Sequence, residues 1–229
     1  MRKILQNLAN SSHSFSLANK FRRKRIEVFK KFIEDMDLNE INILDVGGTP
    51  VFWKNMMIDK KHINLKITLL NLDKLSQEDN TFIYVQGDAI DLGMFSNKQF
   101  DLVFSNSVIE HVCGENGVTF LDQQKMANEI QRVGKRFYVQ TPNYWFPIEP
   151  HFLCPFFQYF PTWIKAFLLR SFNLGWYSKI SDKDESFRVA KSIRLLTLEE
   201  MNKLFPNSFT FKEKFYGLNK SFTKFGDSI

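Results

Sequence analysis

Short apolar runs alternate with helical patterns along the chain up to residue 140. Runs of apolar residues, many of them β-branched or aromatic, predict buried strands, and apolar spacings of three and four residues predict helices. Strands are expected at 41–46, 66–72, 81–86, 100–104 and 136–140. Helices are expected at 17–36, 50–58 and 119–133. Because the two kinds of element alternate, we expect an α/β fold with a mostly parallel sheet and helices on both faces.

The alternation of strand and helix patterns stops after the fifth predicted strand. Residues 144–190 are dense in aromatic residues and prolines and are too long for an ordinary connection, so we expect a functional insertion or lid. A capping box at 197–200 then predicts a further helix. Finally, 209–215 and 220–225 predict a closing antiparallel pair of strands around Gly217. The sheet should therefore have seven strands and end in an antiparallel hairpin.

Composition favours one globular domain over the whole chain, 1–229. Hydrophobic residues make up 44% and charged residues 24% of the 229 residues, which is ordinary for a folded protein. Within this domain, 1–37 is expected to be an N-terminal helical segment that begins with loose residues at 1–16. The insertion at 144–190 is expected to lie beside the site.

The net charge is +6, and much of it lies early in the chain, in a basic run at 22–25. Such a run can meet nucleic acid, anionic lipid or an acidic substrate. However, Ile26, Phe29, Ile33 and Met36 follow at helical spacing. We therefore interpret the basic run as the solvated face of an amphipathic helix.

The cysteine spacing and the hydropathy of the chain indicate where in the cell the protein is located. Cys113 and Cys154 lie far apart without the spacing of a metal site, which predicts free thiols, no metal centre and a reducing, cytoplasmic setting. The first residues become polar too soon for a signal peptide, and no stretch is apolar for long enough to span a membrane. We expect a soluble protein with at most peripheral membrane contact.

Acids and glycines follow the predicted strands. The first strand ends in Asp45-Val-Gly47-Gly48-Thr-Pro, where the glycines permit a sharp turn and Thr49-Pro50 suits a helix start. The next strands end in Asn-Leu-Asp73, Gly-Asp88-Ala89 and Phe-Ser105, and Glu110-His111 comes soon after the last of these. Since ligands bind at the carboxyl ends of parallel strands, these residues predict a cofactor site.

This ordered series resembles the class I methyltransferases that use S-adenosylmethionine, in particular the type 11-like group that acts on small molecules. The resemblance implies a Rossmann-like fold and S-adenosylmethionine as cofactor. It also implies that Gly47 and Gly48 approach the methionine part and that Asp45 helps to anchor its ammonium group. Asp73 is expected to accept both ribose hydroxyls.

The remaining cofactor contacts that the resemblance implies lie at the third and fourth strands. Asp88 is expected to accept from the adenine amino group with the Ala89 N–H nearby, and Ser105 to place backbone groups beside the methionine. Taken singly, each acid is also typical of a capped turn.

Methyl transfer to a hydroxyl requires a base, because an alcohol is a poor nucleophile while protonated. His111 and His151 are the catalytic candidates, and we favour His151 because it lies in the insertion that should recognise the acceptor. His111 can instead be part of a helix start, and His151 a histidine hydrogen-bonded within a lid. The aromatic residues of the insertion suit an apolar acceptor, a sugar or shallow contact with a bilayer, or they form a core of their own.

The main hypothesis is a methyltransferase that acts on a small molecule or glycan, at oxygen, in polysaccharide or secondary-metabolite biosynthesis. Thr49-Pro50 stands where the family often has a third glycine, and this departure is the support for an alternative, a catalytically inactive binding or scaffold protein. A nicotinamide oxidoreductase would need Gly-x-Gly-x-x-Gly, which is absent. The motif typical of DNA amino-methylating enzymes is also absent, so no nucleic acid partner is expected.

Overall fold

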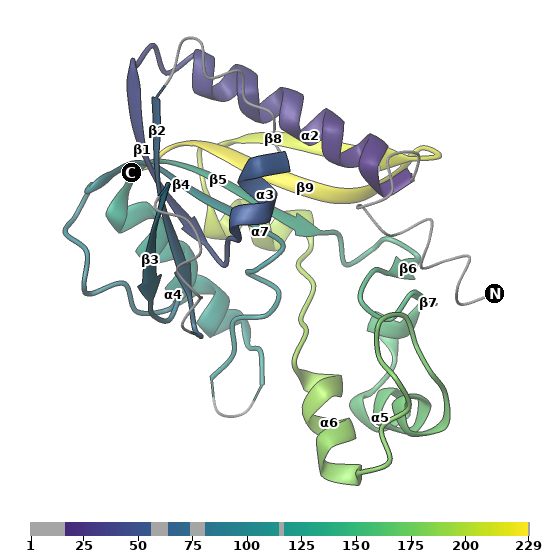
Figure 1. The fold of residues 1–229 in the computed structure, drawn as a ribbon. Helices are drawn as coiled ribbons and strands as arrows, with labels where there is room; N and C mark the ends of the chain where they lie inside the picture. Colours follow the sequence, from purple (N-terminus) through teal and green to yellow (C-terminus); the bar gives the residue numbers. More distant parts are fainter. Residues whose placement is uncertain (1–16, 56–63, 74–80, 115–116, 229) are drawn as a thin grey trace.

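The computed structural model describes residues 17–55, 64–73, 81–114 and 117–228, and Figure 1 shows their arrangement. The expectations for 1–16 and for the end of the helix at 50–58 lie outside the described residues. The main sheet contains β1 (Glu40–Val46), β2 (Asn64–Asn71), β3 (Phe82–Gln86), β4 (Phe100–Asn106), β5 (Gly134–Pro142), β8 (Phe209–Phe215) and β9 (Leu218–Asp227). The helices beside it are α2 (Leu17–Glu34), α3 (Pro50–Asn55), α4 (Phe120–Val133) and α7 (Leu198–Leu204).

The seven strands lie in the order β3-β2-β1-β4-β5-β9-β8. The first five are parallel, whereas β9 runs antiparallel to both β5 and β8. The register pairs Val46 with Leu70 and with Ser105, and Asn71 with Gln86. The carboxyl ends of β1 to β4 therefore meet at one edge of the sheet, which confirms the predicted α/β fold and its closing antiparallel hairpin.

A separate apolar core lies on each face of the sheet. On one face, Phe29 and Ile33 of α2 pack with Trp53 of α3 on strand residues that include Phe104. On the other face, α4 and α7 bury residues such as Ile130 and Met201. Because the parallel strands are covered on both faces, their apolar runs are nearly continuous, and this continuity made them predictable.

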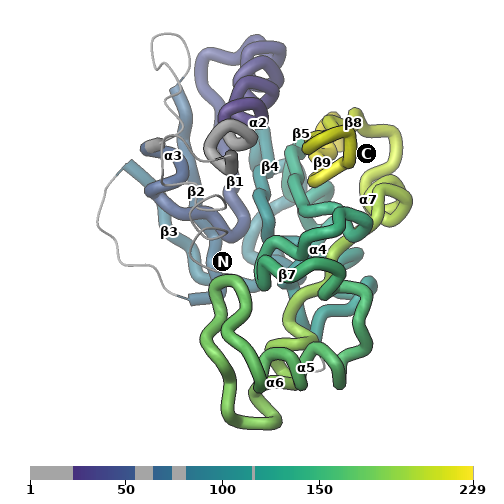
Figure 2. Tube along the Cα trace, turned by 90° about the vertical axis from the view of Figure 1, so that its right-hand side faces the viewer, coloured from purple at the N-terminus to yellow at the C-terminus, as the bar shows by residue number. Residues whose placement is uncertain are grey.

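The insertion forms a small layer of its own beside the carboxyl edge of the sheet (Figures 1 and 2). It contains β6 (Ile148–Glu149), β7 (Cys154–Pro155), the 3-10 helix η1 (Phe157–Tyr159), α5 (Thr162–Ser171) and α6 (Lys183–Lys191). Buried aromatic and aliphatic side chains such as Phe152, Phe157 and Leu169 form its core. This core agrees with one of the alternatives drawn from the sequence, although the individual elements were not predicted.

Two local expectations change in detail. The helix expected at 119–133 ends at Val133, and Gly134, which follows it, has an extended backbone (φ −100°, ψ 142°) and is the first residue of β5. The basic run is only partly a solvated face, because Arg25 is half-buried and forms an ion pair with Glu213 of β8 at 3.0 Å. Glu213 is buried, so this arginine neutralises a charge that would otherwise be costly to bury.

Cys113 and Cys154 are free thiols, as expected. Among the helices that the structure describes, none is long and apolar enough to cross a bilayer.

Candidate functional site

The glycine turn at 47–48 connects β1 to α3. Gly47 has a positive φ of 75°, and a Cβ atom there would lie 2.5 Å from a methyl group of Val108. Gly48 is buried, and a Cβ atom there would lie only 1.8 Å from Oδ2 of Asp45. Side chains are therefore excluded at both positions, and the exposed backbone at Gly47 can approach a ligand closely. Val108 also brings the segment after β4 against this turn.

The acids that follow β2 and β3 lie at the same edge as the glycine turn. Asp73 is exposed, two residues beyond the end of β2. Asp88 is half-buried, and its Oδ1 accepts a hydrogen bond from the backbone N–H of Ile90 at 3.1 Å. Ser105 near the end of β4 is fully buried, and its hydroxyl has no hydrogen-bond partner among the described residues.

The Asp45 side chain packs against the buried side of the glycine turn and does not face solvent. It is buried, and Oδ2 accepts a hydrogen bond from the indole N–H of Trp53 at 2.6 Å. Burial raises the pKa of the Asp45 carboxyl to about 8, although the bond from Trp53 opposes this rise. The carboxyl thus joins β1 to α3, and any effect on a ligand's ammonium group passes through the turn backbone.

We expect Asp45 to make the ligand-free protein less stable as the pH rises from about 4 to 8. In this window the unfolded state loses the Asp45 proton, while burial keeps the carboxyl protonated in the folded state up to a pKa of about 8. The free energy of unfolding should therefore fall by on the order of 5 kcal/mol. Asp45→Asn keeps an acceptor for Trp53 and should remove this decline. Thermal unfolding of both proteins across the pH range measures the difference, and parallel curves would contradict the expectation.

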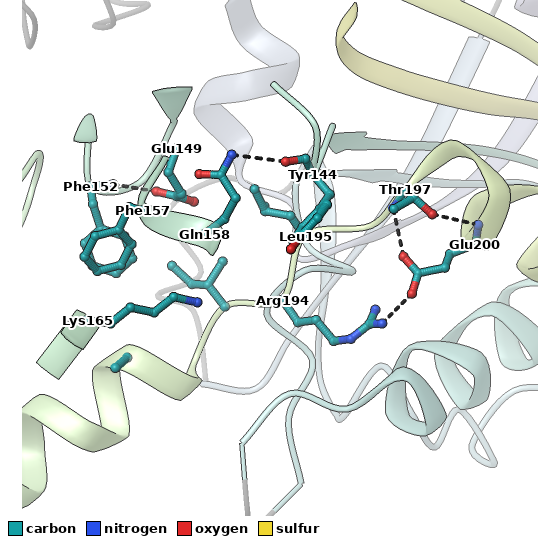
Figure 3. A pocket seen from close by; sticks show the side chains of 12 residues that line it. Tyr144, Glu149, Phe152, Phe157, Gln158, Lys165, Arg194, Leu195, Thr197 and Glu200 are labelled. Atoms are coloured by element: carbon teal, nitrogen blue, oxygen red, sulfur yellow. Dashed lines mark hydrogen bonds and ion pairs between the residues drawn. The ribbon is translucent and has the colours of Figure 1, made fainter. Parts of the chain in front are cut away.

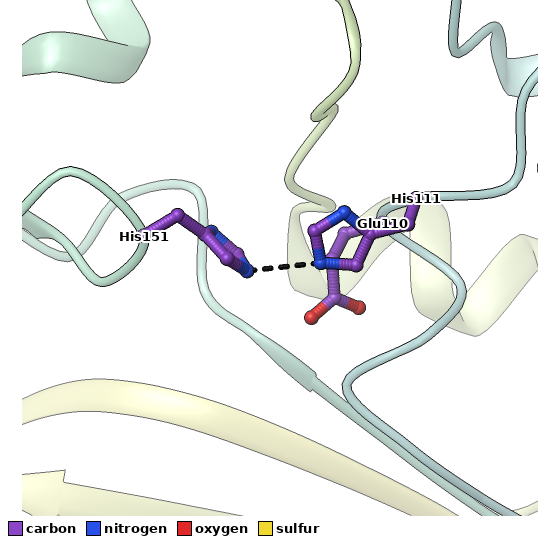
Figure 4. A group of neighbouring side chains, drawn as sticks. All are labelled: Glu110, His111 and His151. Atoms are coloured by element: carbon purple, nitrogen blue, oxygen red, sulfur yellow. Dashed lines mark hydrogen bonds between the residues drawn. The ribbon is translucent and has the colours of Figure 1, made fainter. Parts of the chain in front are cut away.

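Two histidines from distant parts of the chain meet beyond the end of β4 (Figure 4). The Nε2 atoms of His111 and His151 are 3.1 Å apart, and the ring planes are nearly perpendicular. Nδ1 of His151 lies 2.7 Å from Oε1 of Glu149, while Oε2 of Glu149 accepts the backbone N–H groups of His151 and Phe152 at 2.7 Å. Glu149 thereby fixes both the loop and the orientation of the imidazole ring.

The environments of the two histidines push their pKa values apart. Burial and the neighbouring His151 lower the pKa of His111 to about 4, so this ring is neutral at physiological pH. Burial also acts to lower the pKa of His151, but the hydrogen bond and the charge of Glu149 outweigh it and raise that pKa. A histidine held by a buried carboxylate can accept a proton from a hydroxyl, because the carboxylate stabilises the resulting imidazolium.

Glu110 completes the group from within the protein. Its side chain is fully buried; Oε2 accepts the hydroxyl hydrogen of Thr141 at 2.9 Å, and Oε1 has no partner among the described residues. Burial raises the pKa of Glu110 to about 7 despite the opposing effect of His151. The backbone N–H of Arg194 donates to the carbonyl of Glu110 at 2.9 Å. This bond links the segment after β4 to the segment that follows α6.

A cavity of about 270 Å³ reaches Glu149, the carboxylate that holds His151 (Figure 3). Its wall includes Glu149, the rings of Tyr144 and Phe157, and the cations Lys165 and Arg194. Burial lowers the pKa of Lys165, and its ammonium group lies 5.9 Å from the centre of the Phe157 ring. Arg194 also forms an ion pair with Glu200, the acid of the capping box. Rings and charged groups together suit a small polar molecule with apolar faces.

The sequence comparison decides the class of this site. Residues 48–136 match the family described as "Methyltransferase domain". The match begins in the glycine turn, ends in β5 and contains Asp73, Asp88, Ser105 and the Glu110–His111 pair. The chain carries a class I S-adenosylmethionine-dependent methyltransferase domain. The predicted class, its Rossmann-like fold and its cofactor are thereby confirmed.

Solved structures share the fold of this methyltransferase. The N-terminal domain of EvdMO1, crystallised in the presence of SAH and D-fucose, is 11% identical, with a TM-score of 0.51 over 90% of this chain and 82% of that chain. A possible exported protein from Bordetella parapertussis is 10% identical, with a TM-score of 0.54 over 90% of this chain and 68% of that chain.

A third structure is magnesium protoporphyrin IX methyltransferase (ChlM) from Synechocystis PCC 6803 with bound SAH, which is 9% identical. Its TM-score is 0.49 over 90% of this chain and 82% of that chain. At such identities the likeness to the EvdMO1 domain and to the Bordetella protein concerns the fold alone. No curated protein matches the sequence.

The methyltransferase has a turn that fits the cofactor. The backbone of Gly47 is exposed and carries no side chain that would keep a ligand away, and the buried Ser105 hydroxyl has no hydrogen-bond partner among the described residues. Asp73 and Asp88 follow neighbouring strands of the same edge. Thr49-Pro50 does not disturb this arrangement, since α3 begins at Pro50 as expected for a proline in the first helical turn.

The structure brings His111 and His151 into contact, which the sequence did not predict, because each was considered as a separate candidate. Sequence reasoning included Glu110 only as part of the Glu110-His111 pair after the fourth strand, and it assigned no role to Glu149 or Lys165. The Glu-x-His spacing of 149–151 was the available signal for Glu149. No local pattern marks Lys165, because its surroundings come from distant segments.

Proposed function

We propose that the methyltransferase transfers its methyl group to a hydroxyl of a small molecule, with a sugar as the acceptor class. The observation that carries this proposal is the Glu149–His151 pair, joined at 2.7 Å, in which Glu149 is part of the cavity wall. An amine acceptor can react from its neutral form without help, whereas a hydroxyl benefits from a base that takes its proton as the new bond forms. A buried carboxylate that orients a histidine supplies such a base.

The cofactor supplies a sulfonium-bound methyl group that a nucleophile can displace in line. The chain's own residues then have two tasks, to hold the donor and to align and deprotonate the acceptor. For the donor, the backbone at 47–48 would bind the methionine part, Asp73 the ribose hydroxyls, and Asp88 with the Ala89 N–H the adenine. The buried hydroxyl of Ser105 lies at the same edge.

For the acceptor, His151 accepts the hydroxyl proton at Nε2, and Glu149 stabilises the imidazolium through Nδ1. His111 is neutral, and its Nε2 lies 3.1 Å from the same atom, so the acceptor hydroxyl would take the place of His111 beside Nε2 of His151. The rings of Tyr144 and Phe157 and the polar groups of Lys165 and Arg194 offer stacking and hydrogen bonds to a sugar. The D-fucose in the crystallisation of EvdMO1, a protein of similar fold, supports the same acceptor class.

The test is a transfer assay with S-adenosylmethionine carrying a labelled methyl group. The acceptors are free hexoses, deoxyhexoses such as D-fucose, and nucleotide sugars, with small primary amines as the comparison group. We expect label in at least one sugar, and nuclear magnetic resonance should place the methyl group on oxygen. Transfer to amines alone would refute the proposal. Binding of S-adenosylmethionine without transfer to any acceptor would favour the scaffold alternative.

We further propose that the insertion contacts an anionic bilayer surface. Several large rings of the insertion are more than half exposed in the folded protein, namely Phe156, Trp163, Phe167 and Phe172, with Trp145 at 65%. Exposed rings that gather on one layer are typical of a surface that meets a partner or a membrane. The net charge of +6 favours an anionic partner.

We expect Trp163→Ala with Phe167→Ala to reduce binding to phosphatidylglycerol vesicles by at least about tenfold, since each ring would lose on the order of 1 kcal/mol of burial. Co-sedimentation measures the bound fraction. Phe209→Ala with Tyr216→Ala is the matched control, because these rings are also highly exposed but lie on the β8–β9 hairpin. Absence of binding by the unaltered protein would remove the membrane proposal.

A further inference from the structure

We propose that Glu110, His111 and His151 form a binding site for one divalent transition-metal ion of the zinc class. One donor atom from each residue lies within 4.8 Å of the other two (Figure 4). The ligands come from the segment after β4 and from the insertion, so a metal ion would join the insertion to the sheet. This inference goes beyond the proposed transfer reaction and does not depend on it.

The two histidines are arranged like a pair of metal ligands. Nδ1 of His151 is bound to Glu149, and the ring of His111 makes a hydrogen bond to the backbone of Ser192. Both rings are thereby anchored with their Nε2 atoms facing each other at 3.1 Å. Zinc bound to two imidazoles at its usual bond length of about 2.0–2.1 Å holds their nitrogens at a similar separation.

Glu110 offers a third ligand. Its side chain is 0% exposed; Oε2 accepts a hydrogen bond from Thr141, and Oε1 has no partner in the described parts of the chain. A buried carboxylate oxygen without a hydrogen bond is costly, and each such atom in a native structure requires an explanation. A carboxylate oxygen of Glu110 lies within 4.8 Å of a ring nitrogen of each histidine, so a cation bound there would satisfy the carboxylate.

The residue behind His151 also supports metal binding. Glu149 orients His151 through the other ring nitrogen, in the carboxylate–histidine–metal arrangement that fixes a ligand and increases its basicity. Two imidazoles and one carboxylate favour zinc and other first-row transition metals, whereas magnesium and calcium prefer oxygen ligands. Three protein ligands leave a fourth position open for water or an acceptor oxygen.

Metal binding and proton transfer compete for the same atom. Nε2 of His151 has one lone pair, so it cannot hold a metal ion and accept the hydroxyl proton at the same time. The metal-bound form is therefore a second state of this site, in which the insertion is fixed to the end of β4.

The experiment is calorimetric titration of chelator-treated, full-length protein with zinc chloride, and with magnesium chloride in parallel. We expect one zinc ion per chain and no binding of magnesium. His111→Gln and Glu110→Gln should weaken zinc binding by at least 100-fold and 10-fold, respectively, while circular dichroism verifies that both variants fold. Cobalt titration provides a second readout, because its visible absorption reports tetrahedral nitrogen and oxygen ligands.

Cys113→Ser is the matched control, because this exposed thiol lies two residues from His111 and could bind zinc adventitiously. Unchanged affinity in Cys113→Ser with loss in His111→Gln supports the site. Equal affinity in all variants, or loss in Cys113→Ser, overturns it. Methyl transfer is assayed separately on metal-free protein, so that failure of the transfer proposal and failure of the metal site are distinguished.

Discussion

Replacing Asp73 by alanine is expected to weaken the binding of S-adenosylmethionine by about 100-fold or more. A carboxylate that accepts two ribose hydroxyls makes two charge-assisted hydrogen bonds, each worth about 1.5–3 kcal/mol, and the exposure of Asp73 places the effect at the lower end of that range. Calorimetric titration with S-adenosylmethionine and with S-adenosylhomocysteine measures the loss. Both ligands share the ribose, so both should lose affinity equally.

Asp91→Ala is the control for Asp73→Ala. Asp91 is also an exposed acid, but its Oδ1 accepts the backbone N–H of Gly93 in the loop beyond Asp88. We expect its loss to leave the affinity for the cofactor nearly unchanged. NADH should not bind to the unaltered protein, since the glycine spacing for a pyrophosphate is absent. Full affinity in Asp73→Ala would show that the ribose is held elsewhere.

Replacing His151 by glutamine is expected to slow methyl transfer by about 10²- to 10⁴-fold at saturating cofactor and acceptor, the usual contribution of a positioned base. Glutamine can still donate to the buried Glu149, so the variant avoids leaving that carboxylate unpartnered. The affinity for S-adenosylmethionine should not change. A loss of turnover without a loss of cofactor affinity identifies a role in the chemical step.

His151→Ala adds a test by rescue. The smaller side chain leaves space in which added imidazole can accept the proton, and partial recovery of turnover would not be expected if His151 were only structural. His111→Gln is the companion variant, because it removes the neighbour of His151 without removing the proposed base. Retained turnover in both His151 variants would refute the role of His151 as a base.

The sequence predicted the layered fold because the relevant signals are local. A strand such as β1 is recognisable from its own apolar residues, and the glycine turn from the two glycines that follow. The capping box of α7 lies within four residues and forms as expected. The cofactor edge was also predictable, since the ends of parallel strands must meet on one side of the sheet.

The acceptor side was less predictable, because its contacts span long distances in the chain. His111 and His151 are 40 residues apart, and their approach depends on how the insertion folds back against the segment after β4. The cavity likewise combines Glu149 and Lys165 with Arg194, which follows α6. An aromatic-rich stretch does not by itself determine which rings form a core and which remain exposed.

The sequence by itself determined the α/β fold, the glycine turn, the strand-end acids and the methyltransferase class, because each depends on residues adjacent in the chain or on the order of strands. Only the tertiary structure decided that Asp45 lies beneath the turn bound to Trp53 and that Glu149 holds His151. It also decided that His151 meets His111 beside the buried Glu110. These features depend on burial and on contacts between distant segments, and such contacts exist only after the layers have packed.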